Sequence, residues 1–263
     1  MAFEMTDEHL ADFQSQGFIV VPHLFNTTEI SLLAEYAKSD HNVVQNATSR
    51  ADADGHSTKL SLSNELLDTP YAAVVRSERI VSTMSRLLGD EVYHYHHKMM
   101  LKEPRVGGAW EWHQDYGYWY DFGCLFPTMA SCFIAVDRCT RENGCLQVIP
   151  GSHHLGRMNH MKVAGQTGAD PERVEAVLQR MSLKHVEMEP GDGLFFHGNL
   201  LHRSDQNTSD NARWSLICCY NTKQNDPYKK SRHPNYSQLV TLPDSEFETQ
   251  ARRLLDELHS SAG

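Results

Sequence analysis

The middle of the chain, from residue 91 to residue 222, is a succession of short β-like runs separated by Gly, Pro, Asn and Asp. The runs cover residues 91–101, 110–115, 131–136, 145–149, 184–188, 193–197 and 212–220. Helices do not alternate with these runs as they would in a parallel sheet. We therefore expect an antiparallel β sandwich or barrel.

Helical patterns flank this region. Thr6 is expected to cap a helix that stops at Gly17, and Thr27 or Thr28 to cap a second helix. A strand is expected at 18–21, a loop at 40–55, and further helices at 71–88, 170–181 and 244–258. We predict one domain over residues 1–263, with N-terminal helices at about 6–90, a β core at about 91–222 and a C-terminal helix at about 244–259.

Composition excludes several functional classes. The net charge of −10 argues against a nucleic-acid-binding protein, which would normally carry a basic face. No apolar run approaches the roughly 18 residues that span a bilayer, and no secretory signal is recognisable at the start. The six cysteines form no C-x-x-C pair, so we expect free thiols and a cytoplasmic protein.

Residues 113–115, His-Gln-Asp, are the sharpest chemical signal among the 16 histidines of the chain. In a strand, residues i and i+2 point to the same face, so His113 and Asp115 would present an imidazole and a carboxylate side by side. A histidine from a neighbouring strand would complete a facial triad of two histidines and one carboxylate. Such a triad holds Fe(II) and leaves positions open for a cosubstrate and dioxygen.

Two histidines downstream are candidates for the third ligand, His197 at the end of one β run and His202 shortly after it. Arg213 follows His202 at a distance of 11 residues (213 − 202). Its planar guanidinium is suited to grip a carboxylate of a dicarboxylate cosubstrate with two hydrogen bonds. Ser215 would share the strand face of Arg213 and could add a hydroxyl donor.

These residues lie among longer segments that are spread over residues 6–222. The segments are 17–22, 113–115, 142–153, 191–197, 202–204, 207–209 and Arg213. Together they resemble the phytanoyl-CoA dioxygenase family of Fe(II)/2-oxoglutarate-dependent oxygenases. The resemblance implies a mainly β, α+β fold with a double-stranded β-helix core, also called a jelly-roll or cupin-like core.

The resemblance also implies roles for individual residues. Iron would be held by His113, Asp115 and His202, which favours His202 over His197. The cosubstrate 2-oxoglutarate would chelate the metal and place its far carboxylate on Arg213. By position, three more residues resemble family residues near the cosubstrate: Lys59, Lys98 and Phe133. Lys98 and Phe133 depart from the residue types that relatives often carry there.

Asp115 favours oxygen insertion over halogenation, because related halogenases carry a small residue at this position. The expected reaction is hydroxylation of a C–H bond with dioxygen, with release of succinate and carbon dioxide. Desaturation, cyclisation or epimerisation by the same oxidant stay open from the sequence. A non-catalytic cupin-like binding protein and a zinc hydrolase are further alternatives, although neither gives Arg213 a role.

The residues after the metal motif are candidates for the substrate pocket. Tyr116, Tyr118 and Trp119 could line it together with His96, or could belong to the core. Aromatic faces attract cations, so the candidate substrates are small polar metabolites such as amino-acid, quaternary-ammonium or aminophosphonate compounds. Asp121, Arg203 or Lys98 could equally bind a charged group. We expect a small-molecule substrate, no nucleic-acid or membrane partner, and a monomer or homodimer.

Overall fold

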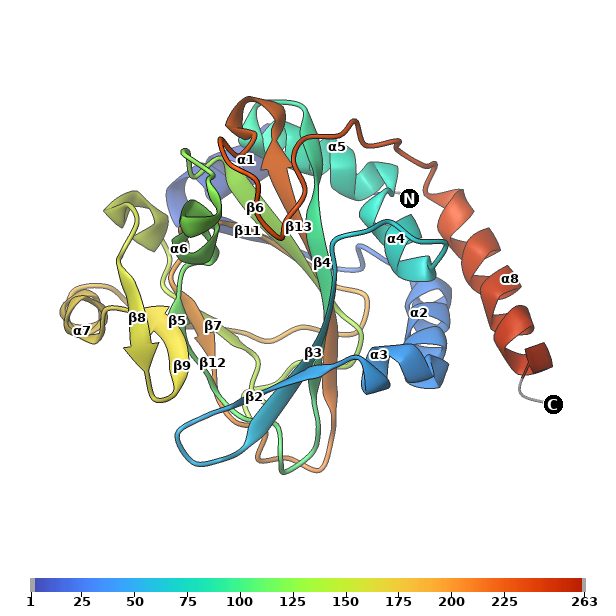
Figure 1. Ribbon diagram of the computed structural model, residues 1–263, viewed down its shortest axis with the longest axis horizontal. Coiled ribbons are helices and arrows are strands. Elements are labelled where there is room, and N and C mark those ends of the chain that lie inside the picture. Colours follow the sequence, from blue (N-terminus) through green and yellow to red (C-terminus); the bar gives the residue numbers. More distant parts are fainter. Residues whose placement is uncertain (1–2, 262–263) are drawn as a thin grey trace.

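The computed structural model describes residues 3–261, and two antiparallel sheets form its centre (Figure 1). The strands are β1 (Phe18–Val21), β2 (Thr48–Ala51), β3 (Ser57–Ser63), β4 (Val92–Lys102), β5 (Trp110–His113), β6 (Met129–Ala135), β7 (Leu146–Val148), β8 (His160–Val163), β9 (Gln166–Ala169), β10 (Lys184–Val186), β11 (Gly193–His197), β12 (His202–Ser204) and β13 (Arg213–Thr222). The larger sheet has the order β1-β11-β6-β13-β4-β3-β2, and the smaller one the order β10-β7-β12-β5. The β8–β9 hairpin stands apart from both sheets, and β9 lies beside β5.

Helices cover the outer face of the larger sheet and the ends of the sandwich (Figure 1). The helices are α1 (Asp7–Gln16), α2 (Thr27–Ser39), α3 (His41–Gln45), α4 (Pro70–Val75), α5 (Glu78–Leu88), α6 (Asp115–Trp119), α7 (Pro171–Leu178) and α8 (Ser245–Ser261), with short 3₁₀ turns η1 (Tyr120–Phe122), η2 (Ser152–Leu155) and η3 (Lys223–Asn225). Among the residues that the structure describes, no helix is both long and apolar enough to cross a bilayer.

Four strands of the larger sheet, β4, β6, β11 and β13, each contribute to two different cores, because successive side chains point to opposite faces. On β4, Met99 and Leu101 join the core beneath the helices, whereas Met100 joins the core between the two sheets. On β6, Ile134 and Phe133 divide in the same way. The inner face of the sheet is therefore free to carry a site while its outer face anchors the helices.

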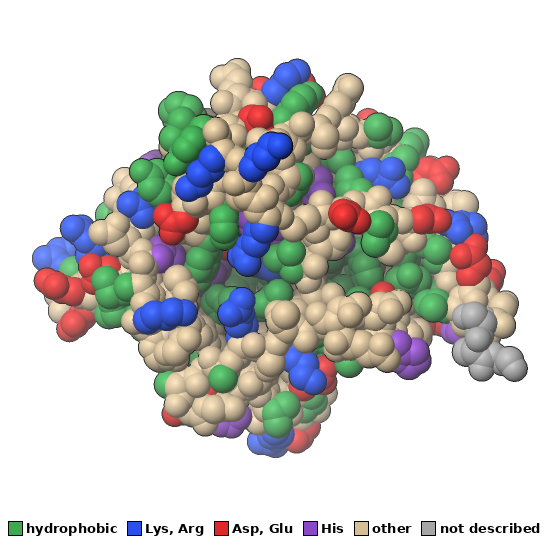
Figure 2. All heavy atoms as spheres, viewed as in Figure 1, with side chains coloured by type: hydrophobic (Ala, Val, Ile, Leu, Met, Phe, Trp, Pro, Cys, Tyr) green, Lys and Arg blue, Asp and Glu red, His purple; other side chains and the backbone are tan. Residues whose placement is uncertain are grey.

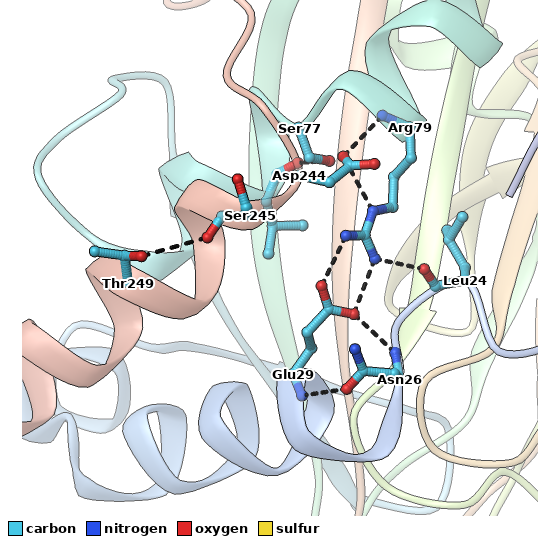
Figure 3. A network of polar contacts seen from close by, with 9 residues as sticks. Leu24, Asn26, Glu29, Ser77, Arg79, Asp244, Ser245 and Thr249 are labelled. Carbon is cyan, nitrogen blue, oxygen red and sulfur yellow. Dashed lines mark hydrogen bonds and ion pairs between the residues drawn. The ribbon is translucent and has the colours of Figure 1, made fainter. Parts of the chain in front are cut away.

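A buried ion-pair network fastens the helices to one another (Figure 3). Arg79 of α5 pairs with Glu29 of α2 at 2.7 Å and with Asp244, just before α8, at 3.0 Å. Glu29 also accepts a 2.8 Å hydrogen bond from the backbone N–H of Asn26, the residue that caps α2. The side chains of Arg79 and Glu29 are only 9% and 7% exposed. One guanidinium thus joins three helices that are far apart in sequence.

The antiparallel β architecture and the flanking helices confirm the main predictions, and Thr6 caps α1 and Gly17 ends it as expected. The predicted cap of α2 is wrong, because Asn26 accepts the hydrogen bond from the N–H of Glu29. The predicted helix 71–88 is two helices. Thr69 caps α4, and the backbone then bends at Ser77, whose hydroxyl donates to the carbonyl of Val74.

The predicted loop at 40–55 is partly structured. Asp40 caps the short helix α3, and β2 forms by pairing with β3. Four further strands, β3, β8, β9 and β12, were not predicted from the sequence. Every residue of β2 is exposed, so it lacks the alternation of buried and exposed residues by which strands are recognised in a sequence.

Candidate active site

Three buried side chains converge between the two sheets. His113 ends β5, His202 begins β12, and the two residues face each other across the pair of strands. Asp115 completes the group, and one potential ligand atom from each of the three residues lies within 4.8 Å of the others. The His113 Nε2 atom is 3.9 Å from Asp115 Oδ1, and the two imidazole centroids are 4.1 Å apart. The arrangement is that of a site for one metal ion with two histidines and one carboxylate.

Both imidazoles are fixed in the tautomer that a metal requires. His113 Nδ1 lies 2.7 Å from the carbonyl oxygen of Glu111, and His202 Nδ1 lies 2.9 Å from that of Leu200. A carbonyl only accepts, so each Nδ1 carries the proton and each Nε2 keeps its lone pair for the metal. Burial, followed by the neighbouring His202, holds the pKa of His113 well below its usual range, which keeps this ligand neutral.

Asp115 reaches the site by a route that differs from the prediction. The strand ends at His113, and Asp115 is the first residue of α6, so the two residues do not share a strand face. Gln114 holds the turn between them, because its amide donates to the carbonyls of Gly156 and Asn199 and accepts from the N–H of Met158. The sequence therefore pointed to His113 and Asp115 through a shared strand face that the structure does not contain.

Ser131 orients the carboxylate of Asp115 from the larger sheet. Its hydroxyl donates a 2.9 Å hydrogen bond to Asp115 Oδ2 and is itself completely buried on β6. The other carboxylate oxygen, Oδ1, is left facing His113. Such a partner fixes the geometry of a metal ligand, and the sequence analysis did not single it out.

Arg213 lies in a small cavity that His113, Asp115 and His202 also line. Its side chain is 2% exposed, its Nε has no hydrogen-bond partner, and it has no ion pair with any carboxylate in residues 3–261. The hydroxyl of Ser215, on the same face of β13, is also buried and unpartnered. Unsatisfied buried donors are rare in proteins, and here they suit the acidic group of a bound ligand. The donors present thus fit a ferrous ion with 2-oxoglutarate.

The structure separates the other residues predicted near the cosubstrate. Phe133 lines the small cavity and lies under the guanidinium of Arg213, whose Cζ is 5.7 Å from the ring centroid. Lys98 lines this cavity and also the larger one beside it. Lys59 is exposed, and its neighbour Leu60 faces the larger cavity instead. The structure therefore gives no support to a role for Lys59 at the cosubstrate.

Lys102 is a buried cation that the sequence analysis missed. It pairs directly with Arg213 in the register of β4 and β13 and is fully buried. Its ammonium donates to Ser204 Oγ at 2.9 Å and to the backbone carbonyl of Asp205. Burial and the neighbouring Arg213 hold the pKa of Lys102 well below its usual range. The alternation of β4, in which His96, Lys98, Met100 and Lys102 share one face, was the signal available in the sequence.

A larger cavity of about 470 Å³ opens beside the metal cluster, and His113, Asp115, Lys98 and Trp110 line both cavities. Three of the four residues predicted to contact the substrate line it: His96, Tyr118 and Trp119. Tyr116 does not, because its ring is buried in the core and its hydroxyl donates to the carbonyl of Cys124. His197 is also outside the site, at the far end of β11, where its ring lies near those of Phe13 and His153.

Comparison with known proteins agrees with this geometry. The family model for phytanoyl-CoA dioxygenase (PhyH) matches residues 13–215. The chain belongs to this family. It is 32% identical over 183 residues to the L-proline trans-4-hydroxylase of Streptomyces griseoviridis, an alignment that covers 64% of this chain and 68% of that protein. Membership confirms the resemblance inferred from the sequence, and the protein is an iron- and 2-oxoglutarate-dependent dioxygenase.

Solved structures show the same family fold. The structure of EctD from S. alaskensis with 2-oxoglutarate and 5-hydroxyectoine superposes with a TM-score of 0.74 at 21% identity, covering 91% of this chain and 88% of that one. The carbocyclase SnoK from nogalamycin biosynthesis superposes with a TM-score of 0.71 at 20% identity, covering 89% and 97%. These similarities confirm the predicted jelly-roll core.

Proposed function

We propose that this dioxygenase hydroxylates an aliphatic C–H bond of a small polar metabolite, with release of succinate and carbon dioxide. The observation that carries the proposal is that the cavity shared by the three metal-binding side chains and Arg213 adjoins a second cavity of metabolite size. A relative in the same family is named as a hydroxylase of L-proline, which is a metabolite of this kind.

In this proposal each residue of the site has a defined task. His113, Asp115 and His202 hold the ferrous ion, and Arg213 binds the far carboxylate of 2-oxoglutarate, with Ser215 as a neighbouring donor. Phe133 packs beneath the guanidinium, and Lys98 lies between cosubstrate and substrate. His96, Tyr118 and Trp119 bound the substrate space.

When bound, iron and 2-oxoglutarate supply the activation of dioxygen and the oxidising power for the C–H bond. The protein provides rigid positions and a dry environment. The Glu111 and Leu200 carbonyls orient the imidazoles, and Ser131 orients Asp115. The buried walls around Arg213 exclude water, which strengthens the attraction between its guanidinium and a carboxylate.

The test is succinate formation by the purified full chain with ferrous iron, 2-oxoglutarate and dioxygen. We expect turnover in the wild type and none in Asp115→Ala, whereas Lys59→Met, an exposed change on the outer side of β3, should behave as the wild type. Equal turnover in Asp115→Ala and the wild type would refute the assignment of the metal site.

Cyclisation is the second candidate reaction, because the structurally similar SnoK is described as a carbocyclase. The products distinguish the two reactions. Hydroxylation adds one oxygen atom from dioxygen to the substrate, whereas cyclisation removes two hydrogen atoms. Mass spectrometry after reaction under ¹⁸O₂ shows which has taken place.

We also propose that the protein works in the cytoplasm, as a monomer or homodimer, without nucleic-acid or membrane partners. The six cysteines support a reducing compartment, because all are free and buried. Burial raises the pKa of each of these thiols, as at Cys132 and Cys218, so they are unreactive.

A further inference from the structure

The larger cavity beside the metal cluster carries a marked excess of positive charge. Four cationic side chains line it: Arg50, Lys98, Lys162 and Arg232. The only carboxylates among its lining residues are Asp52 and Asp115. Figure 2 shows lysine and arginine side chains gathered around the hollow near the centre of this face. The excess does not follow from composition, because the chain as a whole has a net charge of −10.

Neither carboxylate neutralises these cations. Asp52 accepts hydrogen bonds from the backbone N–H groups of Ala109, Asp54 and His56 and from the amide of Gln206. Asp115 is held by Ser131 and belongs to the metal cluster. Across residues 3–261, none of the four cations forms an ion pair with a carboxylate. Four positive charges are thus available to a ligand.

The strand register shows how the cations are distributed with depth. Lys98 lies opposite Leu62 on one side and Ile217 on the other, so it points between the sheets and is half-buried. Arg50 pairs with Thr58, on the face of the hairpin that also carries Leu60 and Leu62. Arg50, Lys162 and Arg232 are exposed, and they surround the entrance from three different segments.

A neutral polar side chain, that of His96, lies deeper in the same cavity. His96 is 3% exposed, and its Nδ1 has no hydrogen-bond partner. Its ring lies between Trp119, at 6.0 Å, and His233, at 5.0 Å. Burial holds the pKa of His96 well below its usual range, so the ring is neutral and can hydrogen-bond a ligand without adding charge.

We infer that the substrate is a small organic acid whose carboxylate or phosphonate is bound at the entrance by Arg50 and Arg232, with Lys162 beside them. The carbon chain then extends past His96 toward the metal cluster. The inference rests on the proposed function and narrows its substrate class. It favours an acid over a quaternary-ammonium substrate, because the four cations form no ion pair with a carboxylate in the described residues and repel a further positive charge.

The test uses simple probes and the purified protein loaded with Ni(II) and 2-oxoglutarate, so that the Arg213 site is already occupied. Butyrate, butylphosphonate, butyramide and choline are titrated by calorimetry. We expect both anions to bind at least about tenfold more tightly than butyramide, and to weaken as salt screens the charges. Choline should show no binding. The stronger of the two anions indicates whether the natural group is a carboxylate or a phosphonate.

Matched variants locate the binding. Arg50→Met and Arg232→Met should each weaken anion binding by about tenfold or more, since each removes a charged fork. Lys59→Met and Lys230→Met serve as controls, because each removes an exposed charge that lies close in sequence to Arg50 or Arg232 but does not line the cavity. Both variants should bind the anions as tightly as the wild type does. Circular dichroism confirms that each variant is folded.

Three results would overturn the inference: butyramide binding as tightly as the anions, choline binding more tightly, or unchanged anion binding in both arginine variants. Succinate formation by the iron-loaded enzyme is measured in parallel without added substrate. If succinate forms without added substrate but the anions bind no more tightly than butyramide, only the inference about the cationic entrance fails. If 2-oxoglutarate neither binds nor turns over, the proposed function fails.

Discussion

At the scale of single residues, hydrogen bonds from the backbone and from one serine determine what the metal cluster can do. The carbonyls of Glu111 and Leu200 set the tautomers of the two histidines, and Ser131 holds one oxygen of Asp115. These contacts come from three different strands or strand ends. They hold the side chains that would bind the metal in fixed orientations, as the hydrogen-bond partners of metal ligands do.

Ser131→Ala should weaken iron binding without unfolding the protein. The change removes the donor to Asp115 Oδ2 and leaves the carboxylate free to rotate. Loss of such a partner typically costs about 10- to 100-fold in metal affinity. Titration of the metal-free protein with Fe(II) under anaerobic conditions measures the effect, and Ser131→Thr, which keeps the hydroxyl, is the control. Identical affinities for Ser131→Ala and wild type would contradict this role.

Arg213→Met should raise the KM for 2-oxoglutarate by about 100-fold or more, because the variant loses a buried, charge-assisted contact with a carboxylate. The kcat at saturating cosubstrate should change less, since the metal-binding side chains are untouched. Succinate formation as a function of 2-oxoglutarate concentration gives both parameters. An unchanged KM would show that the cosubstrate carboxylate binds elsewhere.

At the scale of elements, the positions of the metal-binding side chains are set by the turns that follow or precede strands as well as by the strands themselves. The sequence pattern placed His113 and Asp115 on one strand face, yet the structure brings them together by a turn from β5 into α6. The identity of these residues could be predicted because the motif is short and local. The turn could not, because it is held by Gln114 through bonds to Gly156, Met158 and Asn199, which are far away in sequence.

The buried network of Arg79, Glu29 and Asp244 should be a strong determinant of helix packing. Glu29→Ala leaves Arg79 with a partly uncompensated charge and removes the side-chain acceptor for the Asn26 N–H. We expect the free energy of unfolding to fall by about 3 kcal/mol. Glu248→Ala, which breaks an exposed ion pair with Arg252 on α8, should cost less than about 1 kcal/mol.

Urea denaturation of both variants at neutral pH provides the comparison. Because α2 and α8 contact each other directly, the loss of Glu29 should also loosen α8. Hydrogen exchange of the α8 amides should therefore accelerate in Glu29→Ala. Equal free energies of unfolding for the Glu29 and Glu248 variants would show that the buried network contributes no more to stability than an exposed ion pair.

At the scale of the whole molecule, buried histidines make stability depend on pH. Burial is the main cause that lowers the pKa of His94 to about 3 and those of His97, His197 and His233 to about 4. In the unfolded chain these groups take up protons as the pH falls below about 6.5. The unfolded state then binds more protons than the folded one, so stability is fully present above about pH 6.5 and falls as the pH decreases toward 4.

The expected loss between about pH 7 and pH 5 is about 2 kcal/mol for each such histidine. His197→Asn keeps an acceptor for the N–H of Asn199 while it removes the titrating ring. Its free energy of unfolding, measured with urea at both pH values, should therefore decline less steeply than that of the wild type. Parallel declines in the two proteins would contradict the assignment of the effect to His197.

Much of the architecture follows from local patterns, and the remainder depends on contacts distant in sequence. The buried strands β6, β11 and β13 were predicted because their apolar runs are nearly continuous. The β2–β3 and β8–β9 hairpins were missed because their strands carry few large apolar residues: β2 is wholly exposed, and β9, although mostly buried, reads Gln-Thr-Gly-Ala. The cations at the cavity entrance were missed for the same reason, since Arg50 and Lys162 lie on these two hairpins.

The position of β2 at the free edge of the larger sheet has a consequence for how this scaffold can diversify. The strand pairs with β3 alone, so residues 48–51 can be exchanged without interrupting any other pairing. We expect that grafting this segment from a relative changes which molecules are accepted while iron loading persists. Substrate selectivity could then evolve by changes in this edge strand alone, while the residues that would bind iron and 2-oxoglutarate stay the same.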